Sequence, residues 1–572
     1  MKTLLLAVFA AGTSLATSAE ACRQLAMDDY RDRMQGAWIG QMVGVSWGMP
    51  TEFKYNGKII PAADVPVWAS DFPLRWAYDN DDLYVEMTFL HTLENYGLEA
   101  TARQAGIDFA NSEYQLWCAN SQGRRNLRQG MAPPSCSHPL VNRRGNDIDY
   151  QIEADYSGII APGCPQEVIR LGNIFGRLMN YGDGVWAGQF IGALYAEAYF
   201  SSDVDVLLDA GLRAIPPESD YAQMVRRVRS WHKEFPNDWT KAWEKVRATY
   251  DKSANPALRD SNGGIDVRLN GACIVLGLLY GGGDLDRSME IAMRCGWDSD
   301  CNPSNVGGVL MCARGAKALP AKYTEKLDSE RYFSHTAYNQ KKLYTVCEKL
   351  ARQVVARAGG RIETDATGRE WMVIPQKSPV PDAFHPTWAP DELTKDIYND
   401  EEMTRQKFGL RLFDDPYSIA KVDPAVRVQK ALDALCPGWK TSANANDMNP
   451  GFQGEVRTLS GCATRCILTH PPKRDEPVVL SRTVKVSSNV ASLHFCAGNA
   501  VGGDSRLVVR IDGMEMLSTL IRSPREAHNV DMRPYDISLA PWVGREVKVE
   551  LLNQPTGWYN EGVFWCDLRV TP

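Results

Sequence analysis

The chain has 572 residues, of which 44% are hydrophobic and 23% are charged, and its formal net charge is −7 at pH 7. This composition is that of an ordinary globular protein, and the length exceeds what one hydrophobic core usually supports, so two or three domains are expected. The negative charge gives no electrostatic basis for a nucleic-acid partner, and none is predicted.

Residues 1–21 have the layout of a secretory signal peptide. Met1-Lys2 precedes an apolar run over residues 4–11, and small residues follow up to Ala19-Glu20-Ala21. The apolar run is too short to cross a bilayer as a helix, and no other run is long enough, so no membrane span is expected. Cleavage after Ala21 would leave Cys22 first, but Ala19-Glu20 matches a lipidation signal poorly. We therefore expect a secreted or periplasmic protein.

The pattern from about residue 27 to residue 357 is helical. Glycines at positions 36, 40, 44 and 48 recur every four residues, which lays them along one side of a helix. Such a stripe lets a second backbone approach closely, although each interior glycine costs on the order of 1 kcal/mol relative to alanine. The stripe predicts a helix in the middle of an all-α body.

Two acidic turns in this region each precede a helical pattern. Asn80-Asp81-Asp82 comes before a helix with an apolar face, and Asp298-Ser299-Asp300 follows a helix over Asp286–Cys295. Asn302-Pro303 then predicts the start of a helix that runs to Leu319. A helix N-terminus repels a cation, so a divalent ion there needs several acidic ligands. Four carboxylates from two turns make an oxygen-rich site of the kind that holds Mg²⁺, Mn²⁺ or Ca²⁺.

A third acidic segment runs from Asp147 to Tyr156. On a helix, Asp149 and Glu153 would share one face, and Gln151 and Asp155 a neighbouring one. Like charges four residues apart destabilise a helix, whereas the apolar residues between them favour partial burial. A functional site and a solvated surface both stay open as interpretations. Asp183, which lies in a glycine-flanked turn, is a further candidate for binding sugar hydroxyls.

The sequence changes character after residue 360. Residues 361–374 predict a small hairpin, and a short helical stretch near 424–435 precedes a β-patterned region. Strands are expected over residues 478–486, 491–496, 506–511, 547–552 and 562–570. These strands predict an antiparallel β-sandwich over residues 436–572, after a helical catalytic domain over residues 22–435. The sandwich lacks a concentrated acid–base set, so we expect an accessory domain, and it resembles carbohydrate-binding modules.

The chain contains fourteen cysteines, which in an exported protein predict disulfide bonds. Spacing alone does not give the pairing, and no histidine or cysteine partners complete a zinc site. Five of the cysteines crowd the last quarter of the sequence: Cys436, Cys462, Cys466, Cys496 and Cys566.

Three ordered motifs resemble the ADP-ribosylglycohydrolase family. The segment 33–53, which ends in Gly48-Met49-Pro50-Thr51-Glu52-Phe53, resembles the opening helix of that family. Asn80-Asp81-Asp82 looks like its Thr/Ser-Asp-Asp turn, and Gly296-Trp297-Asp298-Ser299-Asp300-Cys301-Asn302 is similar to its Gly-Gly-Asp-Thr-Asp-Thr-Asn turn. The resemblance covers residues 27–350 and implies an all-α orthogonal bundle with a dinuclear Mg²⁺ centre that cleaves N- or O-glycosidic bonds to ribose.

The same resemblance implies roles for individual residues. It places Glu52 near the scissile bond, and the metal ligands that it implies are Asp81, Asp82, Asp298 and Asp300. Asn80 stands where the family usually has a hydroxyl ligand, although its amide oxygen could coordinate. Cys301 replaces a Thr, and a thiol is a poor Mg²⁺ ligand. Val45 stands where an Asp is common, so one ion rather than two, or Ca²⁺ in place of Mg²⁺, stays open.

Glycoside cleavage requires proton transfer and stabilisation of an oxocarbenium-like transition state. The candidate acid and base groups are the carboxylates of Glu52, Glu153 and Asp149. Aromatic side chains near the turns could stack on a sugar or a base, although core packing accounts for them equally well. The candidate substrate-binding residues are Gln151, Asp155, Asp183, Trp47, Trp186 and Trp297.

Three functions follow from these patterns. The first is an exported, metal-dependent glycoside hydrolase whose substrate is a furanoside in a polysaccharide or glycoconjugate, since the glycine-rich loop with which the family contacts ADP-ribose is not apparent. The second is a true ADP-ribosyl hydrolase. The third is a glycan-binding protein that has lost catalysis, for which Cys301 and Val45 would be the evidence.

Overall fold

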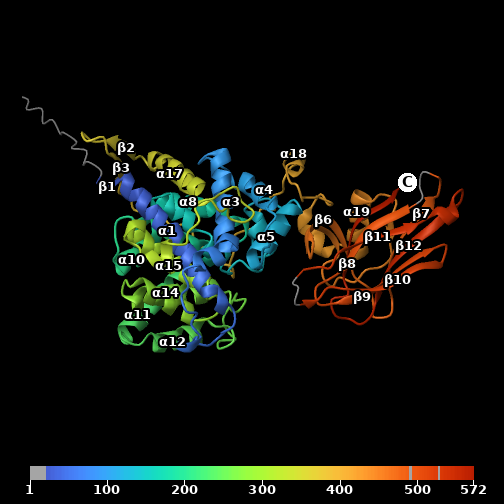
Figure 1. The fold of residues 1–572 in the computed structure, drawn as a ribbon, viewed down its shortest axis with the longest axis horizontal. Helices are drawn as coiled ribbons and strands as arrows, with labels where there is room; N and C mark the ends of the chain where they lie inside the picture. Colours follow the sequence, from blue (N-terminus) through green and yellow to red (C-terminus); the bar gives the residue numbers. More distant parts are fainter. Residues whose placement is uncertain (1–20, 489–491, 526–528, 572) are drawn as a thin grey trace, which may run out of the picture.

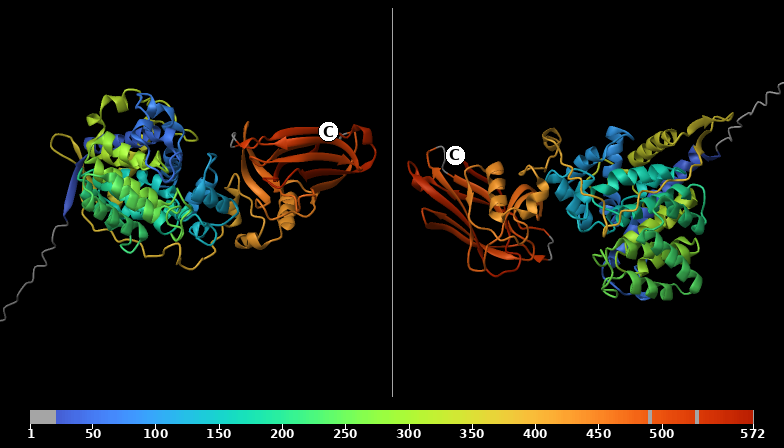
Figure 2. Two further views of the ribbon diagram at one scale, coloured as in Figure 1. Left: turned by 90° about the horizontal axis from the view of Figure 1, so that it is seen from below. Right: turned by 180° about the vertical axis from the view of Figure 1, so that it is seen from behind.

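The computed structural model describes residues 21–488, 492–525 and 529–571, so the predicted signal peptide lies, apart from Ala21, outside the described residues. A helical body and a β-sandwich lie side by side along the long axis of the molecule (Figures 1 and 2). The expected architecture, a mainly α body followed by an all-β region, is confirmed. None of the helices in the described part of the chain is long and apolar enough to cross a membrane.

The helices alternate with short turns through the first part of the chain. Their bounds are α1 Met27–Gly48, α2 Phe72–Arg75, α3 Asp81–Tyr96, α4 Ala102–Ala110, α5 Cys118–Arg128, α6 Asp149–Ile152, α7 Asp155–Ile159, α8 Pro165–Phe175, α9 Asp183–Ala198, α10 Val204–Ala214, α11 Asp220–Glu234, α12 Trp239–Tyr250, α13 Val267–Gly281, α14 Leu285–Arg294, α15 Cys301–Arg314, α16 Ala321–Thr324, α17 Gln340–Arg357, α18 Asp400–Thr404 and α19 Pro424–Leu435.

Helix α1 lies along α15 with its glycine stripe at the contact. A Cβ atom on Gly36 would lie 2.3 Å from the carbonyl oxygen of Met311, and one on Gly40 would lie 2.3 Å from that of Gly307. The same holds at Gly44, which faces the backbone of Pro303. Any side chain larger than hydrogen would therefore force the two helices apart, which is the physical reason for the four-residue repeat.

Two helical predictions were wrong in detail. Helix α15 begins at Cys301, with Asp300 rather than Asn302 as its N-cap residue. It ends at Arg314 instead of Leu319 because Gly315 adopts a φ of +84°, which ends a right-handed helix. The acidic segment is not one helix: α6 stops at Ile152, and Glu153 and Ala154 separate it from α7.

The strands form one small sheet beside the helices and two larger sheets in the sandwich. Their bounds are β1 Cys22–Ala26, β2 Arg361–Thr364, β3 Glu370–Pro375, β4 Lys440–Thr441, β5 Gly451–Thr458, β6 Gly461–Thr469, β7 Val478–Lys485, β8 Ser492–Asn499, β9 Asp504–Ile511, β10 Met514–Arg522, β11 Arg533–Ser538, β12 Glu546–Pro555 and β13 Val563–Thr571.

The small sheet has the order β1-β3-β2 and contains the predicted hairpin as β2 and β3. The sandwich sheets have the orders β10-β9-β12-β7-β4 and β11-β8-β13-β6-β5, and their strands pair antiparallel. The five expected strands correspond to β7, β8, β9, β12 and β13, whereas β4, β5, β6, β10 and β11 were missed.

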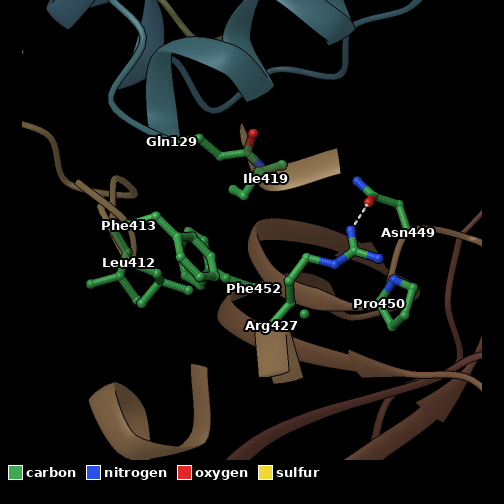
Figure 3. Close-up of a pocket in the computed structure, with 10 residues that line it drawn as sticks. Gln129, Leu412, Phe413, Ile419, Arg427, Asn449, Pro450 and Phe452 are labelled. Carbon is green, nitrogen blue, oxygen red and sulfur yellow. Dashed lines mark hydrogen bonds between the residues drawn. The ribbon is translucent and has the colours of Figure 1, made fainter. Parts of the chain in front are cut away.

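Helix α19 belongs to the sandwich rather than to the helical body. Its buried residues Val428, Ala431 and Leu432 share one hydrophobic cluster with the inward-facing residues of the two sheets. Helix α19 therefore packs with the sandwich, although it precedes residue 436, where the prediction places the boundary. A small pocket lies where α5, the segment 410–419 and the start of β5 meet, and there Arg427 hydrogen-bonds to Asn449 (Figure 3).

The thirteen cysteines from Cys118 to Cys566 are free thiols in the structure. Most of those in the helical body are buried among apolar side chains, as at Cys273 and Cys347. The disulfide bonds expected from the sequence therefore stay a prediction.

Candidate metal centre and substrate cavity

The two acidic turns meet at the end of the glycine stripe. Gly48 is the last residue of α1, and a Cβ atom there would lie 2.0 Å from the carbonyl oxygen of Ser299. The Thr51 hydroxyl lies 2.8 Å from the Ser299 hydroxyl, and the Phe53 backbone N–H donates to the Trp297 carbonyl oxygen over 2.9 Å. The last glycine and the turn after it therefore attach the segment carrying Glu52 directly to the turn carrying Asp298 and Asp300.

The first acidic turn reaches the same point from α3. Asn80 caps this helix: its Oδ1 accepts the backbone N–H of Asp82 over 2.9 Å, and its Nδ2 lies 3.4 Å from Asp300 Oδ2. The side chain thus links the two turns. Its amide oxygen accepts the capping bond and retains a second lone pair, so the role of Asn80 as a metal ligand stays a prediction.

The carboxylates repel one another strongly. Burial and the neighbouring Asp300 raise the pKa of Asp81 to about 7, and the same two causes, with Asp81 added, raise the pKa of Asp82 far above its usual value. Burial and Asp300 also raise the pKa of Asp298. Ionising all of them together therefore requires a compensating positive charge.

The protein does not supply that charge. No Lys, Arg or His side chain lines the cavity, and none of the ion pairs in the described ranges involves Asp81, Asp82, Asp298 or Asp300. Both carboxylate oxygens of Asp82 and the Oδ1 of Asp298 are buried without a hydrogen-bond partner. Orphaned carboxylate oxygens converging from two helix starts fit a hard divalent cation, which these aspartates could hold.

Cys301 also lies at this cluster. Asp298, Asp300 and Cys301 each place one possible ligand atom within 4.8 Å of the other two. The Cys301 Sγ lies 3.7 Å from Asp300 Oδ1. Burial raises the pKa of the Cys301 thiol well above its usual value, so the thiol is neutral at physiological pH. A neutral thiol is a poor partner for Mg²⁺, which leaves ligation to the aspartate oxygens.

Asp81, Asp298 and Asp300 line a cavity of about 380 Å³ that opens to solvent, whereas the fully buried Asp82 does not. Glu52 lies in its wall, where burial and then the charges of Asp300 and Asp81 raise its pKa to about 8. Asp149 also lines the cavity, and its carboxylate accepts the backbone N–H groups of Ala119 and Asn120 at the start of α5. Burial and Asp147 raise the pKa of Asp149 to about 8. Two candidate acid–base groups thus share one cavity with Asp81, Asp298 and Asp300.

Glu153 lies behind this cavity. It is fully buried, it accepts a hydrogen bond from the side chain of Asn120, and burial followed by the charge of Asp149 raises its pKa well above its usual value. Asn120 itself lines the cavity. Glu153 therefore contacts the wall of the site and not the open space that a substrate would fill, so a direct catalytic role is not supported.

Three polar residues predicted to bind substrate lie elsewhere. Gln151 accepts a hydrogen bond from Tyr221, and Asp155 accepts from Tyr195 and Asn305. Asp183 accepts the backbone N–H of Tyr221. All three are buried and none lines the cavity. Their polar atoms pair with groups inside the helical body rather than with the cavity, where a substrate-binding residue is expected.

The three predicted tryptophans are also core residues. Trp47 donates its Nε1–H to the Pro66 carbonyl oxygen, and Trp186 stacks on Phe384. Trp297 stacks on Trp243 and is only 1% exposed. None of the three lines the cavity.

Other aromatic side chains occupy the cavity wall instead, and the sequence analysis missed them. Phe53 is 40% exposed and Trp117 is 49% exposed, and both line the cavity together with Tyr84. Phe53 follows Glu52 and Tyr84 follows Asp82 by two residues, so proximity to the motifs was an available signal. No sequence signal pointed to Trp117, because this residue lies directly before α5, which reaches the site only through the tertiary fold.

Comparison with known proteins agrees with the helical fold. The sequence matches the ADP-ribosylglycohydrolase family over residues 26–361. No curated protein matches. Among solved structures, an ADP-ribosylglycohydrolase-related protein complex is 14% identical, with 57% of this chain and 100% of that chain covered and a TM-score of 0.39.

Two further structures overlap a smaller part of the chain. A cyclase from Fischerella sp. TAU is 14% identical, with 24% of this chain and 85% of that chain covered and a TM-score of 0.18. The carbohydrate-binding module TmCBM27, studied for specific mannan recognition, is 13% identical, with 26% and 93% covered and a TM-score of 0.17. These likenesses are too weak to carry an argument. The matched region, which spans more than half of the sequence and contains both acidic turns, establishes that the chain belongs to the ADP-ribosylglycohydrolase family.

Proposed function

We propose that this protein is an exported, metal-dependent glycoside hydrolase that cleaves an N- or O-glycosidic bond of a furanoside in a polysaccharide or glycoconjugate. The observation that carries metal dependence is the cluster of Asp81, Asp298 and Asp300 in the wall of one cavity without a basic side chain, with the buried carboxylate of Asp82 coupled to them. Family membership supports hydrolysis of a glycosyl bond. Export rests on the signal-peptide pattern of residues 1–21.

The residues of the cavity have different proposed roles. The four aspartates would hold one or two divalent cations, Mg²⁺ or in its place Ca²⁺ or Mn²⁺, and such an ion polarises sugar hydroxyls or lowers the pKa of a bound water. Glu52 has a pKa raised to about 8, so it can hold a proton at neutral pH and deliver it to the leaving group. A bound cation nearby would lower that pKa and favour the base form. Asp149 faces the same space as a second proton carrier.

The aromatic side chains of the cavity wall are proposed to bind the substrate. Phe53, Tyr84 and Trp117 offer apolar ring faces at the cavity, which suit the apolar face of a sugar or the plane of a base. The β-sandwich is proposed to bind carbohydrate beside the hydrolytic body. The second candidate function is removal of ADP-ribose from a modified protein or small molecule. It is favoured by the family match and by the same ring faces, which could stack on adenine.

The test compares substrates and metals directly. Protein stripped with a chelator is reconstituted with Mg²⁺, Mn²⁺ or Ca²⁺ and assayed on ADP-ribosyl-arginine and on a panel of aryl furanosides. Turnover of a furanoside supports the first function, and turnover of ADP-ribosyl-arginine alone supports the second. Glycan binding without turnover of either substrate class would overturn both and favour the non-catalytic interpretation.

Two variants locate the activity. Asp298→Asn removes one buried carboxylate charge and is expected to abolish metal-dependent turnover. Asp284→Asn is the matched control, because Asp284 is the N-cap residue of α14 and asparagine caps equally well. Full activity of Asp298→Asn would contradict the assignment of the metal centre.

A further inference from the structure

Three cysteines lie in a row across adjacent strands of the sandwich. Cys566 on β13 is the pairing partner of Cys496 on β8. On the other side of β13, Trp565 lies opposite Ile467 of β6, so Cys566 and Cys466 follow one step along these antiparallel strands. Cys566 therefore occupies the middle strand with one cysteine on each side. Neither sequence spacing nor the metal centre predicts this arrangement.

The three side chains point to the same face of the sheet. Their neighbours Phe495, Trp565 and Ile467 belong to the main core between the two sheets. Because side chains alternate along a strand, the cysteines next to them project from the opposite, outer face. There Cys466 and Cys566 belong to a separate small apolar cluster with Val456 and Val530.

The spacing of the strands suits a disulfide bond. Directly opposed residues of antiparallel strands have Cα atoms about 4.5–5.5 Å apart, within the roughly 4.4–6.8 Å that a disulfide spans. Cys466 and Cys496 are two strands apart, about 9.5 Å, which is beyond that range. Only Cys566 can therefore pair with either neighbour while the sheet stays intact.

We propose that Cys466, Cys496 and Cys566 form an oxidation site in which Cys566 makes a disulfide with one flanking cysteine and the third remains a thiol able to exchange with it. The thiols of Cys466 and Cys496 donate hydrogen bonds to the Cys566 sulfur and lower the pKa of Cys566, which increases its thiolate fraction. Cys496 and Cys566 are partly exposed, so a small reagent can reach them, whereas Cys466 is buried.

The oxidant is a small-molecule disulfide such as oxidised glutathione. The Cys566 thiolate attacks one sulfur of that disulfide, which forms a mixed disulfide and releases one glutathione thiolate. A neighbouring protein thiol loses its proton and attacks the Cys566 sulfur, which forms the protein disulfide and releases the second glutathione. Two protein thiols are oxidised and one glutathione disulfide is reduced to two thiols. Attack by the third cysteine on the new bond then moves the disulfide between strands.

The test uses the full-length folded protein. It is incubated with oxidised glutathione, its free thiols are blocked with iodoacetamide, and its disulfides are mapped by mass spectrometry of unreduced peptides. We expect links from Cys566 to Cys496 and to Cys466, with the remaining thiol alkylated in each case. Oxidation should raise the Tm of the sandwich, and dithiothreitol should reverse the shift. If all three cysteines are alkylated in folded protein that has been incubated with oxidised glutathione, the proposal is overturned.

Single variants separate the two links. Cys466→Ser should leave only the link to Cys496, and Cys496→Ser should leave only the link to Cys466. In Cys566→Ser neither flanking cysteine should be oxidised, and a bond between Cys466 and Cys496 in that variant would refute the strand geometry. Cys462→Ser, an exposed cysteine of the same sheet, is the control and should leave both links unchanged. Far-UV circular dichroism identifies folded variants, and the two single-link variants keep the test decisive if Cys566→Ser does not fold.

Discussion

The glycine stripe of α1 should set the position of the acidic turn, and Gly48→Ala tests this. The added Cβ would lie 2.0 Å from the Ser299 carbonyl oxygen and 2.6 Å from Asp300 Cα. Because Cβ contacts under 3.0 Å essentially never occur and ordinary contact begins at 3.4 Å, the turn must move by at least about 1 Å relative to α1. Overpacking of this kind costs about 1–3 kcal/mol of stability. A displacement of ~1 Å at a catalytic site can also lower turnover ~100-fold.

Gly36→Ala is the matched control at the other end of the stripe. Its Cβ would lie 2.3 Å from the Met311 carbonyl oxygen, a comparable conflict. It lies twelve residues from Gly48, about 18 Å along the helix, and far from the acidic turns. Both variants should therefore lose similar stability in urea unfolding, whereas only Gly48→Ala should lose affinity for Mn²⁺ or Mg²⁺ in calorimetric titration. Equal metal affinity in the two variants would refute the argument that the stripe positions the site.

Three further predictions concern charge. Removing metal with a chelator should lower the Tm, because an ion present at 100 times its Kd stabilises the fold by about 2.7 kcal/mol, and the shift should be absent in Asp298→Asn. Glu52→Gln should lower kcat by about 10²–10⁴-fold and retain metal-dependent thermal stabilisation; unchanged kcat would exclude proton transfer by Glu52. Burial raises the pKa of Asp183 from 3.8 to about 7. The stability that its protonated carboxyl group contributes is therefore complete below pH 4 and is lost as the pH rises through 7. Asp183→Asn should therefore be the more stable protein at pH 8, by up to ~4 kcal/mol, with no difference near pH 4, as urea unfolding at both pH values would reveal.

The sequence predicted the parts of the site that depend on local pattern. The stripe from Gly36 to Gly48 has a period that only a close helix contact explains, and the structure places α15 against it. The turns at Asp81-Asp82 and Asp298–Asp300 stand beside helix starts, so their direction could be inferred from capping rules. Their convergence was expected from the family resemblance rather than from local pattern.

The predicted substrate-binding residues that do not line the cavity were chosen on the assumption that polar residues near a motif face a substrate. Asp155 and Gln151 lie in short helices whose polar side chains turn inward to meet Tyr195 and Tyr221. Sequence periodicity cannot distinguish a buried, hydrogen-bonded carboxylate from one that lines a cavity, because both interrupt an apolar pattern in the same way. Trp117 was missed for the opposite reason, since α5 contributes to the site only through contacts distant in sequence.

The glycine stripe and the unpaired carboxylates act together. Close approach of α1 and α15 brings the Glu52 segment against the turn of Asp298 and Asp300, which raises the repulsion among these groups and would destabilise the fold if all were ionised. Without a cation, protons must occupy several of the carboxylates, and each proton removes a negative charge that could hold a metal. Binding of a divalent cation therefore releases protons and relieves the repulsion that the helix packing creates. Packing of α1 against α15 through glycine contacts thus concentrates the negative charge with which these aspartates could hold a metal ion against the positive ends of their helices.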